Sequence, residues 1–255
     1  HITMAIGLIF LLSPSGLLLR SVSPWLTGFD RPPNSYLFPD EYGFFLILGL
    51  ILKEIPFLIL VTLSALREFS SSKFFDMGKS LQHSSFSTWF ILIFPIIYKK
   101  IRLVVFIIIA FSSSVVDMSL LLAPSTPSTL SVRILQIFQS SDIDSFFIAS
   151  NLSLIQLFII IILLIVWIFF EKIIKSKFFY FFFIKITSFK SEFLKITILC
   201  FNIILFSLSF MGIICSILWG FSENWYFPNF FPNDLNIENF LNFYYQNKSL
   251  ILISI

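Results

Sequence analysis

Two adjacent charged residues, Lys53 and Glu54, lie in the middle of a long apolar run. A charged side chain is costly inside a membrane and usually faces another helix or a water-filled cavity. Adjacent residues on a helix do not face each other, so we expect Lys53 and Glu54 to have separate partners. They could lock packed helices together or line a hydrophilic pathway. Asp117, which ends a small polar stretch, has the same two interpretations, because small residues also permit close helix packing.

The chain offers little for catalysis. Its one histidine beyond the first residue is His83, whereas nucleophilic catalytic sets need a histidine among partners. Cys200 and Cys215 lie in one apolar run, about 22 Å apart on a helix, beyond disulfide distance, and are predicted to be packing residues. Asp142 and Asp144 could be a metal-binding pair, although a solvated loop is the simpler interpretation. We predict no catalytic residue, no metal and no cofactor.

The composition is that of a membrane protein. Of the 255 residues, 57% are hydrophobic and only 12% are charged. Soluble domains have roughly 45–50% apolar and about 25% charged residues, so a soluble enzyme is excluded. The net charge of +3 is small and scattered, which argues against a nucleic-acid surface. The predicted class is an all-α polytopic membrane protein.

Crossing the hydrocarbon core takes roughly 20 apolar residues, and five segments qualify as predicted spans. A shorter apolar stretch, 89–98, is expected at the interface, leading into the third span. The cluster Ser13-Pro14-Ser15-Gly16 predicts a break near the end of the first span. The predicted spans are Met4–Leu19, Tyr42–Leu66, Leu103–Ala123, Phe147–Phe170 and Leu194–Phe221.

The positive charges favour one side of this arrangement. Twelve of the seventeen Lys and Arg residues fall in or beside the loops 67–102 and 171–193, and four fall on the other side. Because cytoplasmic loops are enriched in Lys and Arg, both loops are predicted to be cytoplasmic. The C-terminal tail from Ser222 is then outside. Most acidic residues lie on the outer side as well.

The first long cytoplasmic loop contains Asp76-Met77-Gly78-Lys79-Ser80-Leu81-Gln82, nine further residues, and Leu92-Ile93-Phe94-Pro95. This segment resembles the E-A-A-x3-G-x9-I-x-L-P signature of ABC importer permeases. Its departures from that signature include Asp76, Met77, Gly78 and Gln82. In that family the segment is a short helix that docks on the ATPase subunit. The resemblance therefore implies ATPase-coupling roles for Asp76, Met77, Gly78, Leu81, Gln82 and Pro95.

Other stretches are similar to the permease branch that includes thiamine and ferric-iron importers, closest to the thiamine type. They are 14–16, 23–28, 52–58 and 111–132. Members of this branch have two fused, duplicated halves. The resemblance implies a partial type I importer fold: residues 1–171 as a first half without its beginning, 172–193 as a linker, and 194–255 as the start of a second half. The chain is expected to be a fragment, because it begins at His1 and ends within an apolar run.

The resemblance further implies a multi-pass protein of the bacterial inner membrane that is not itself an enzyme. Its partners would be a separate ABC ATPase, an extracytoplasmic solute-binding protein, the lipid bilayer and a small solute such as thiamine, with no nucleic acid. Independently, Phe74, Met77 and Leu81 follow an i, i+3, i+7 pattern. That apolar stripe fits docking into a groove or lying on the membrane surface.

Two alternatives from other classes stay open. One is a membrane-embedded transferase that uses Asp142 and Asp144 with a lipid-linked donor. The other is an organelle-encoded subunit of a respiratory complex, which only the Phe-rich composition suggests.

Overall fold

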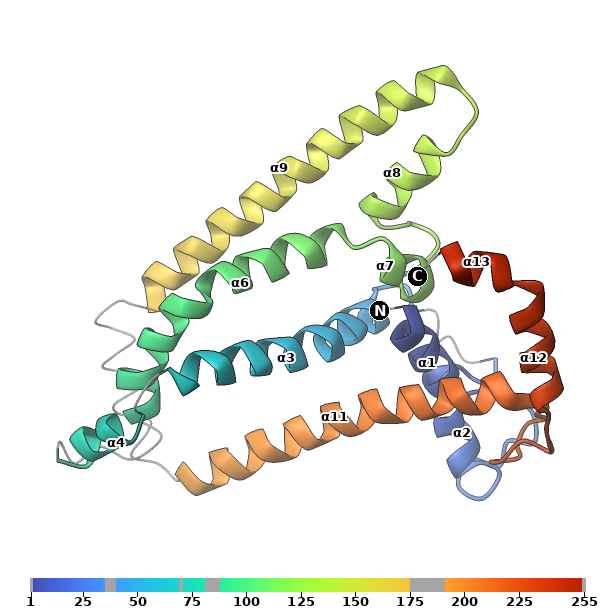
Figure 1. Cartoon of the computed structure of the whole chain (residues 1–255), viewed down its shortest axis with the longest axis horizontal. Coiled ribbons are helices and arrows are strands. Elements are labelled where there is room, and N and C mark those ends of the chain that lie inside the picture. The colour runs from blue at the N-terminus through green and yellow to red at the C-terminus, as the bar shows by residue number, and fades with distance from the viewer. Residues whose placement is uncertain (1, 35–39, 69–70, 81–87, 175–190, 254–255) are drawn as a thin grey trace. The chain divides into compact units, whose positions relative to one another are not determined.

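A computed structural model describes residues 2–34, 40–68, 71–80, 88–174 and 191–253 (Figure 1). The described chain is mostly helical, and its one sheet in these ranges has two short strands. The fold class is therefore that of an all-α membrane protein, as the composition predicts. The chain forms two compact units that each combine distant segments, residues 1–49, 117–127 and 206–255 in the first and 50–116 and 128–205 in the second. The sequential halves implied by the resemblance stay a prediction.

The first unit begins with α1 (Ile2–Leu12) and α2 (Leu17–Val22). The helix is interrupted between them at residues 13–16, as the Ser-Pro-Ser-Gly cluster predicts. A Cβ on Gly16 would lie only 2.6 Å from the Leu11 carbonyl oxygen, so this tight connection requires glycine. The unit also contains the start of α3 (Phe44–Arg67), α7 (Asp117–Leu122) and the end of α11 (Ser191–Phe221).

The core of the first unit forms where α1, α2 and α11 meet. Leu11, Leu17 and Cys215 are buried there, together with Trp225 of the segment that follows α11. Gly7 of α1 touches the backbone of α11, because a Cβ on it would overlap the Gly212 carbonyl group. Small residues at such crossings allow helices in membranes to pack closely. The prediction that Cys215 is a packing residue is confirmed, whereas Cys200 is exposed.

After α11 the first unit ends in short elements. β1 (Ser222–Asn224) pairs antiparallel with β2 (Asp234–Leu235). Two helices follow, α12 (Ile237–Gln246) and α13 (Lys248–Ile253). The side chain of Asn236 caps α12 by accepting a hydrogen bond from the Glu238 amide, which is the usual role of asparagine at this position.

The second unit contains the rest of α3, then α4 (Ser71–Ser80), a π-helical turn η1 (Trp89–Ile93) and α6 (Phe94–Ser114). Next come α8 (Leu130–Phe138) and the long α9 (Ile143–Ile174). Figure 1 shows α8 folded back beside the first turns of α9. A core of Ala65, Ile93, Ile97 and Ile101 joins α3 to η1 and α6.

Four helical segments in the described ranges are long and apolar enough to cross a membrane: Ile2–Val22, Phe44–Arg67, Ile143–Ile174 and Ile196–Phe221. The prediction of a fifth continuous span over 103–123 is wrong, because α6 ends at Ser114, Val115 is extended, and a new helix starts at Asp117. Only twelve residues of α6 follow Arg102, fewer than the roughly 20 that a typical span needs. The predicted approach segment 89–98 is helical and leads into α6.

Candidate functional site

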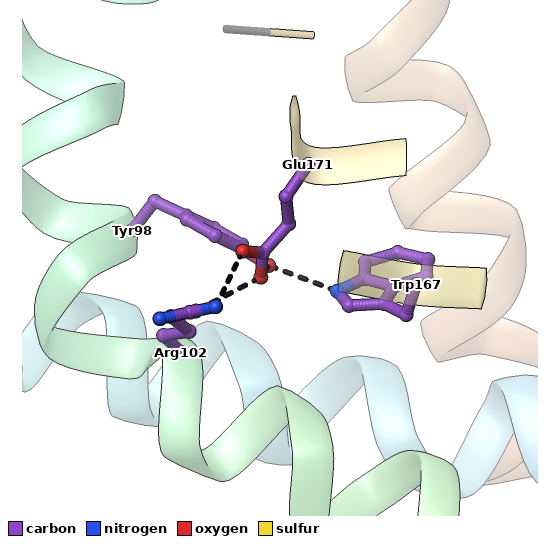
Figure 2. Close-up of polar contacts among 4 residues, drawn as sticks. All are labelled: Tyr98, Arg102, Trp167 and Glu171. Carbon is purple, nitrogen blue, oxygen red and sulfur yellow. Dashed lines mark hydrogen bonds and ion pairs between the residues drawn. The ribbon is translucent and has the colours of Figure 1, made fainter. Parts of the chain in front are cut away.

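A polar cluster joins α6 to the end of α9 (Figure 2). The Glu171 carboxylate accepts a hydrogen bond of 2.6 Å from the Tyr98 hydroxyl and one of 3.1 Å from Nε of Arg102. Its second oxygen lies 2.9 Å from Nη2 of Arg102. Trp167 completes the chain of contacts by donating from its indole nitrogen to the Tyr98 oxygen over 2.9 Å. One buried carboxylate of α9 thus accepts hydrogen bonds from two donors of α6.

The spacing along each helix explains why these four side chains meet. Tyr98 and Arg102 lie four residues apart on α6, and Trp167 and Glu171 lie four residues apart on α9. Residues at this spacing share one helix face, so each helix presents an aromatic ring and a charge to the other. The Glu171 side chain is only 6% exposed, and a buried carboxylate requires such a charged partner.

A second polar contact lies further along the same two helices. The Gln156 side-chain amide of α9 donates to the Ser113 carbonyl of α6 over 2.7 Å. Tyr98 and Ser113 are fifteen residues apart on α6, and Gln156 and Glu171 are fifteen residues apart on α9. Since the order is reversed, α6 and α9 pack antiparallel in a register with a polar contact at each end.

Lys53 and Glu54 pair with each other, their Nζ and Oε1 atoms 3.2 Å apart. The expectation of separate partners is therefore wrong. Both side chains are long enough to bend across the helix surface, and both are largely shielded, at 17% and 13% exposed. Pairing removes most of the cost of two isolated charges in apolar surroundings. The site lies one turn before the kink-prone Pro56, which cannot donate a hydrogen bond to the Leu52 carbonyl.

The predicted coupling residues fall on and around α4. Phe74 and Phe75 pack against the core of the second unit, and Gly78 is pressed against Thr88, leaving no room for a Cβ. Asp76 and Met77 are exposed on the other side of the helix. The predicted apolar stripe is thus divided, because Phe74 faces inward and Met77 outward. Leu81, Gln82 and also His83 lie outside the described residues.

Pro95, the last predicted coupling residue, is the second residue of α6 and directly follows the π turn. A proline ring inside a helix clashes with the preceding turn and removes one hydrogen bond. The π turn, where the Phe94 amide bonds to the Trp89 carbonyl, widens the helix just before this position. Pro95 therefore shapes the entry into α6.

Asp117 and the acidic pair lie at helix starts. Asp117 is half-buried as the first residue of α7. Asp142 and Asp144 flank the first residue of α9, and the Asp142 carbonyl accepts hydrogen bonds from Ser145. Within the described ranges, no three His, Cys, Asp or Glu side chains come together as metal ligands. Asp142 and Asp144 therefore lie at the start of α9, where negative charge interacts favourably with the helix dipole, and no third ligand lies beside them in the described ranges.

Glu171, Tyr98 and Trp167 were not predicted as site residues from the sequence, and Arg102 was predicted only to be a loop charge. The available signal was the spacing of four within each pair, together with a lone acid at the lysine-rich end of an apolar run. In the comparisons with known proteins, no family model, curated protein or solved structure matches the chain. The site must therefore be interpreted from its own geometry.

Proposed function

We propose that this chain is the membrane-spanning part of an importer permease subunit and that α4 is its ATPase-docking helix. The observation that carries the proposal is the position of α4 in the connection between α3 and α6, with one face packed and one exposed. Phe74, Phe75 and Gly78 face the chain's own core, which leaves Asp76 and Met77, the latter 55% exposed, for a partner.

A docking helix can pass the movement of a partner to the rest of the chain only if it is packed firmly against that chain. α4 rests on η1, and the end of α3 is tied to the start of α6 by an ion pair between Glu68 and Lys100, 2.6 Å long. The hydrogen bond from Lys100 lowers the pKa of the Glu68 carboxyl, because it favours the ionised form of that carboxyl. Arg102, one half-turn later, binds Glu171 of α9. Movement of α4 would thus reach α3, α6 and α9 together.

In this proposal the chain hydrolyses nothing itself. A separate ABC ATPase would move α4, the spanning helices would switch the pathway between inward and outward access, and an extracytoplasmic binding protein would deliver a small solute such as thiamine. The connection 67–102 and the end of α9 would both face the cytoplasm of a bacterium, which requires α6 to cross the membrane beside α9. The Lys53–Glu54 pair, inside a spanning helix, would lie on the pathway or lock the helices around it.

The test is site-specific crosslinking in cells that make the full-length chain together with a co-expressed ABC ATPase. Met77→Cys should crosslink to a cysteine in the ATPase groove, whereas Phe75→Cys, on the inward face of the same helix, should not. Met77→Asp should abolish solute uptake without changing the amount of inserted protein, because an exposed residue contributes little to folding.

The exposed Lys79→Asp, two residues after Met77 and therefore on a different side of the helix from it, serves as the charge control and should retain more uptake than Met77→Asp. Absence of a crosslink at position 77, combined with normal uptake by Met77→Asp, would overturn the assignment of α4 as a docking helix.

A further inference from the structure

Arg20 is buried in the first unit without a counter-ion. Its side chain donates four hydrogen bonds, all to backbone carbonyls: Nε to Ser15, Nη1 to Tyr226 and Asn229, and Nη2 to Trp225, over 2.7–3.2 Å. The residue is only 3% exposed. No carboxylate in the described ranges lies within ion-pair distance of it.

Aromatic rings complete the surroundings of this guanidinium. Its central carbon lies 4.9 Å from the centre of the Trp225 ring, 5.6 Å from that of Phe227 and 5.9 Å from that of Trp219. Carbonyl and ring contacts stabilise a cation but leave its net charge in place. A guanidinium has five N–H groups, so one N–H of Nη2 has no protein acceptor among the described residues.

A cavity of about 260 Å³ opens beside this charge. Arg20 forms part of its wall, together with the small polar residues Ser21 and Ser23 and with Asn229. Its volume is slightly below the roughly 300–1,000 Å³ of sites for drug-sized ligands, which suits a group the size of a lipid head. The cavity therefore combines a wall that carries an uncompensated positive charge with room for a small anion.

The cavity lies at the level where a membrane meets water. Arg20 is two residues from the end of the first spanning segment, Ile2–Val22. Trp25, which lines the cavity, is 92% exposed, and the nearby Tyr226 and Phe231 are 65% and 67% exposed. Exposed aromatic side chains at the ends of spanning helices lie at the level of the lipid headgroups. The anion most abundant at that depth is a phospholipid phosphate.

We propose that this cavity binds the phosphate of an anionic phospholipid, with Arg20 as its charge partner. The bound lipid neutralises a cation that the protein leaves uncompensated and holds the segment 225–230 against the end of the first span. The site does not depend on the transport function proposed above, and it is distinct from the cluster on α6 and α9.

The test is native mass spectrometry of the full chain in mild detergent with equal amounts of phosphatidylglycerol and phosphatidylcholine, and separately with inorganic phosphate. We expect phosphatidylglycerol to be retained at least tenfold more than phosphatidylcholine, and millimolar phosphate not to displace it. Equal retention of the two lipids would overturn the proposal. Displacement by millimolar phosphate would also overturn it, because the ligand would then be a soluble anion.

Arg20→Gln should remove the preference, but this change also alters the contacts to residues 225–229. Ser21→Phe is therefore the decisive variant, since it fills the cavity while leaving all four Arg20 hydrogen bonds in place. Ser21→Ala is its matched control. We expect at least a tenfold loss of phosphatidylglycerol in Ser21→Phe with an unchanged melting temperature, and wild-type retention in Ser21→Ala. Undiminished retention in Ser21→Phe would refute the site.

Discussion

Removing the negative charge of Glu171 should loosen the contact between α6 and α9. In Glu171→Gln the side chain keeps its size and can still accept the hydrogen bond from Tyr98. It loses the charge that holds Arg102 through two contacts, of 3.1 and 2.9 Å. The substitution thus tests the ion pair and leaves the packing of the cluster nearly unchanged.

The two partners differ in exposure, which sets the expected cost. Stranding one member of a fully buried ion pair costs about 3–5 kcal/mol, and a hydrogen bond to a charged group contributes about 1.5–3 kcal/mol. The Arg102 side chain is 42% exposed, so water can solvate its guanidinium once the pair is broken. We therefore expect the free energy of unfolding to fall by about 2 kcal/mol. In a chain of this size that corresponds to a drop in Tm of about 4–8 °C.

Thermal unfolding of the detergent-purified full chain measures this drop directly. Lys172→Gln is the matched control, since it removes an exposed charge from the next residue of the same helix and should leave Tm within about 1 °C. The charge swap of Arg102→Glu combined with Glu171→Arg should recover part of the loss. An unchanged Tm in Glu171→Gln would refute the view that this ion pair holds the two helices together.

Three further outcomes follow from close contacts. Gly7→Ala should destabilise the first unit by about 1–3 kcal/mol through overpacking. The control is Gly212→Ala, which should have the Tm of the wild type, because the nearest atom to a Cβ on Gly212 would be 3.6 Å away. Lys53→Leu and Glu54→Leu should each lower the free energy of unfolding by about 3 kcal/mol, and the double variant should lower it by much less than the sum of the two. Strict additivity in a double-mutant cycle would contradict the pairing. Lys100→Met should raise the lowered pKa of the Glu68 carboxyl, as measured by a ¹³C NMR titration. The ion pair is present above this pKa and is lost as the pH falls through it. An unchanged pKa of Glu68 in Lys100→Met would exclude the pair.

The spans could be predicted largely from sequence because lipid imposes a single strong requirement, a continuous apolar helix. The predicted start of 42–66 lies two residues before that of α3, and the break at residues 13–16 was evident from its residue types. The prediction failed at 103–123, where the apolar sequence continues but the helix is interrupted after Ser114. Nothing in the composition of Val115 and Val116 distinguishes an extended connection from a helix, since valine occurs in both.

The contacts between helices were much less predictable. Glu171 and Arg102 are separated by 69 residues, and their meeting depends on the register of two packed helices. The pairing of Lys53 with Glu54 was missed for a different reason. The rule that neighbours point apart describes Cβ directions, and it fails for side chains whose charged ends lie several bonds away.

That register bears on whether α6 crosses the membrane despite its basic start. Its two polar contacts with α9 lie fifteen residues apart on both helices, which is about 22 Å along the axis. α9 has the length and composition of a spanning helix, and the proposed permease arrangement requires α6 to accompany it into the hydrocarbon core, which is about 30 Å thick. Lys99, Lys100 and Arg102 would then lie at the headgroups, where long cationic side chains are readily accommodated, and only the twelve residues of α6 after Arg102, about 18 Å, would enter the core. In that arrangement the end of α9 and the start of α6 would lie on the same side of the membrane, joined by the Glu171 cluster, which is what a docking helix on α4 needs in order to move α9.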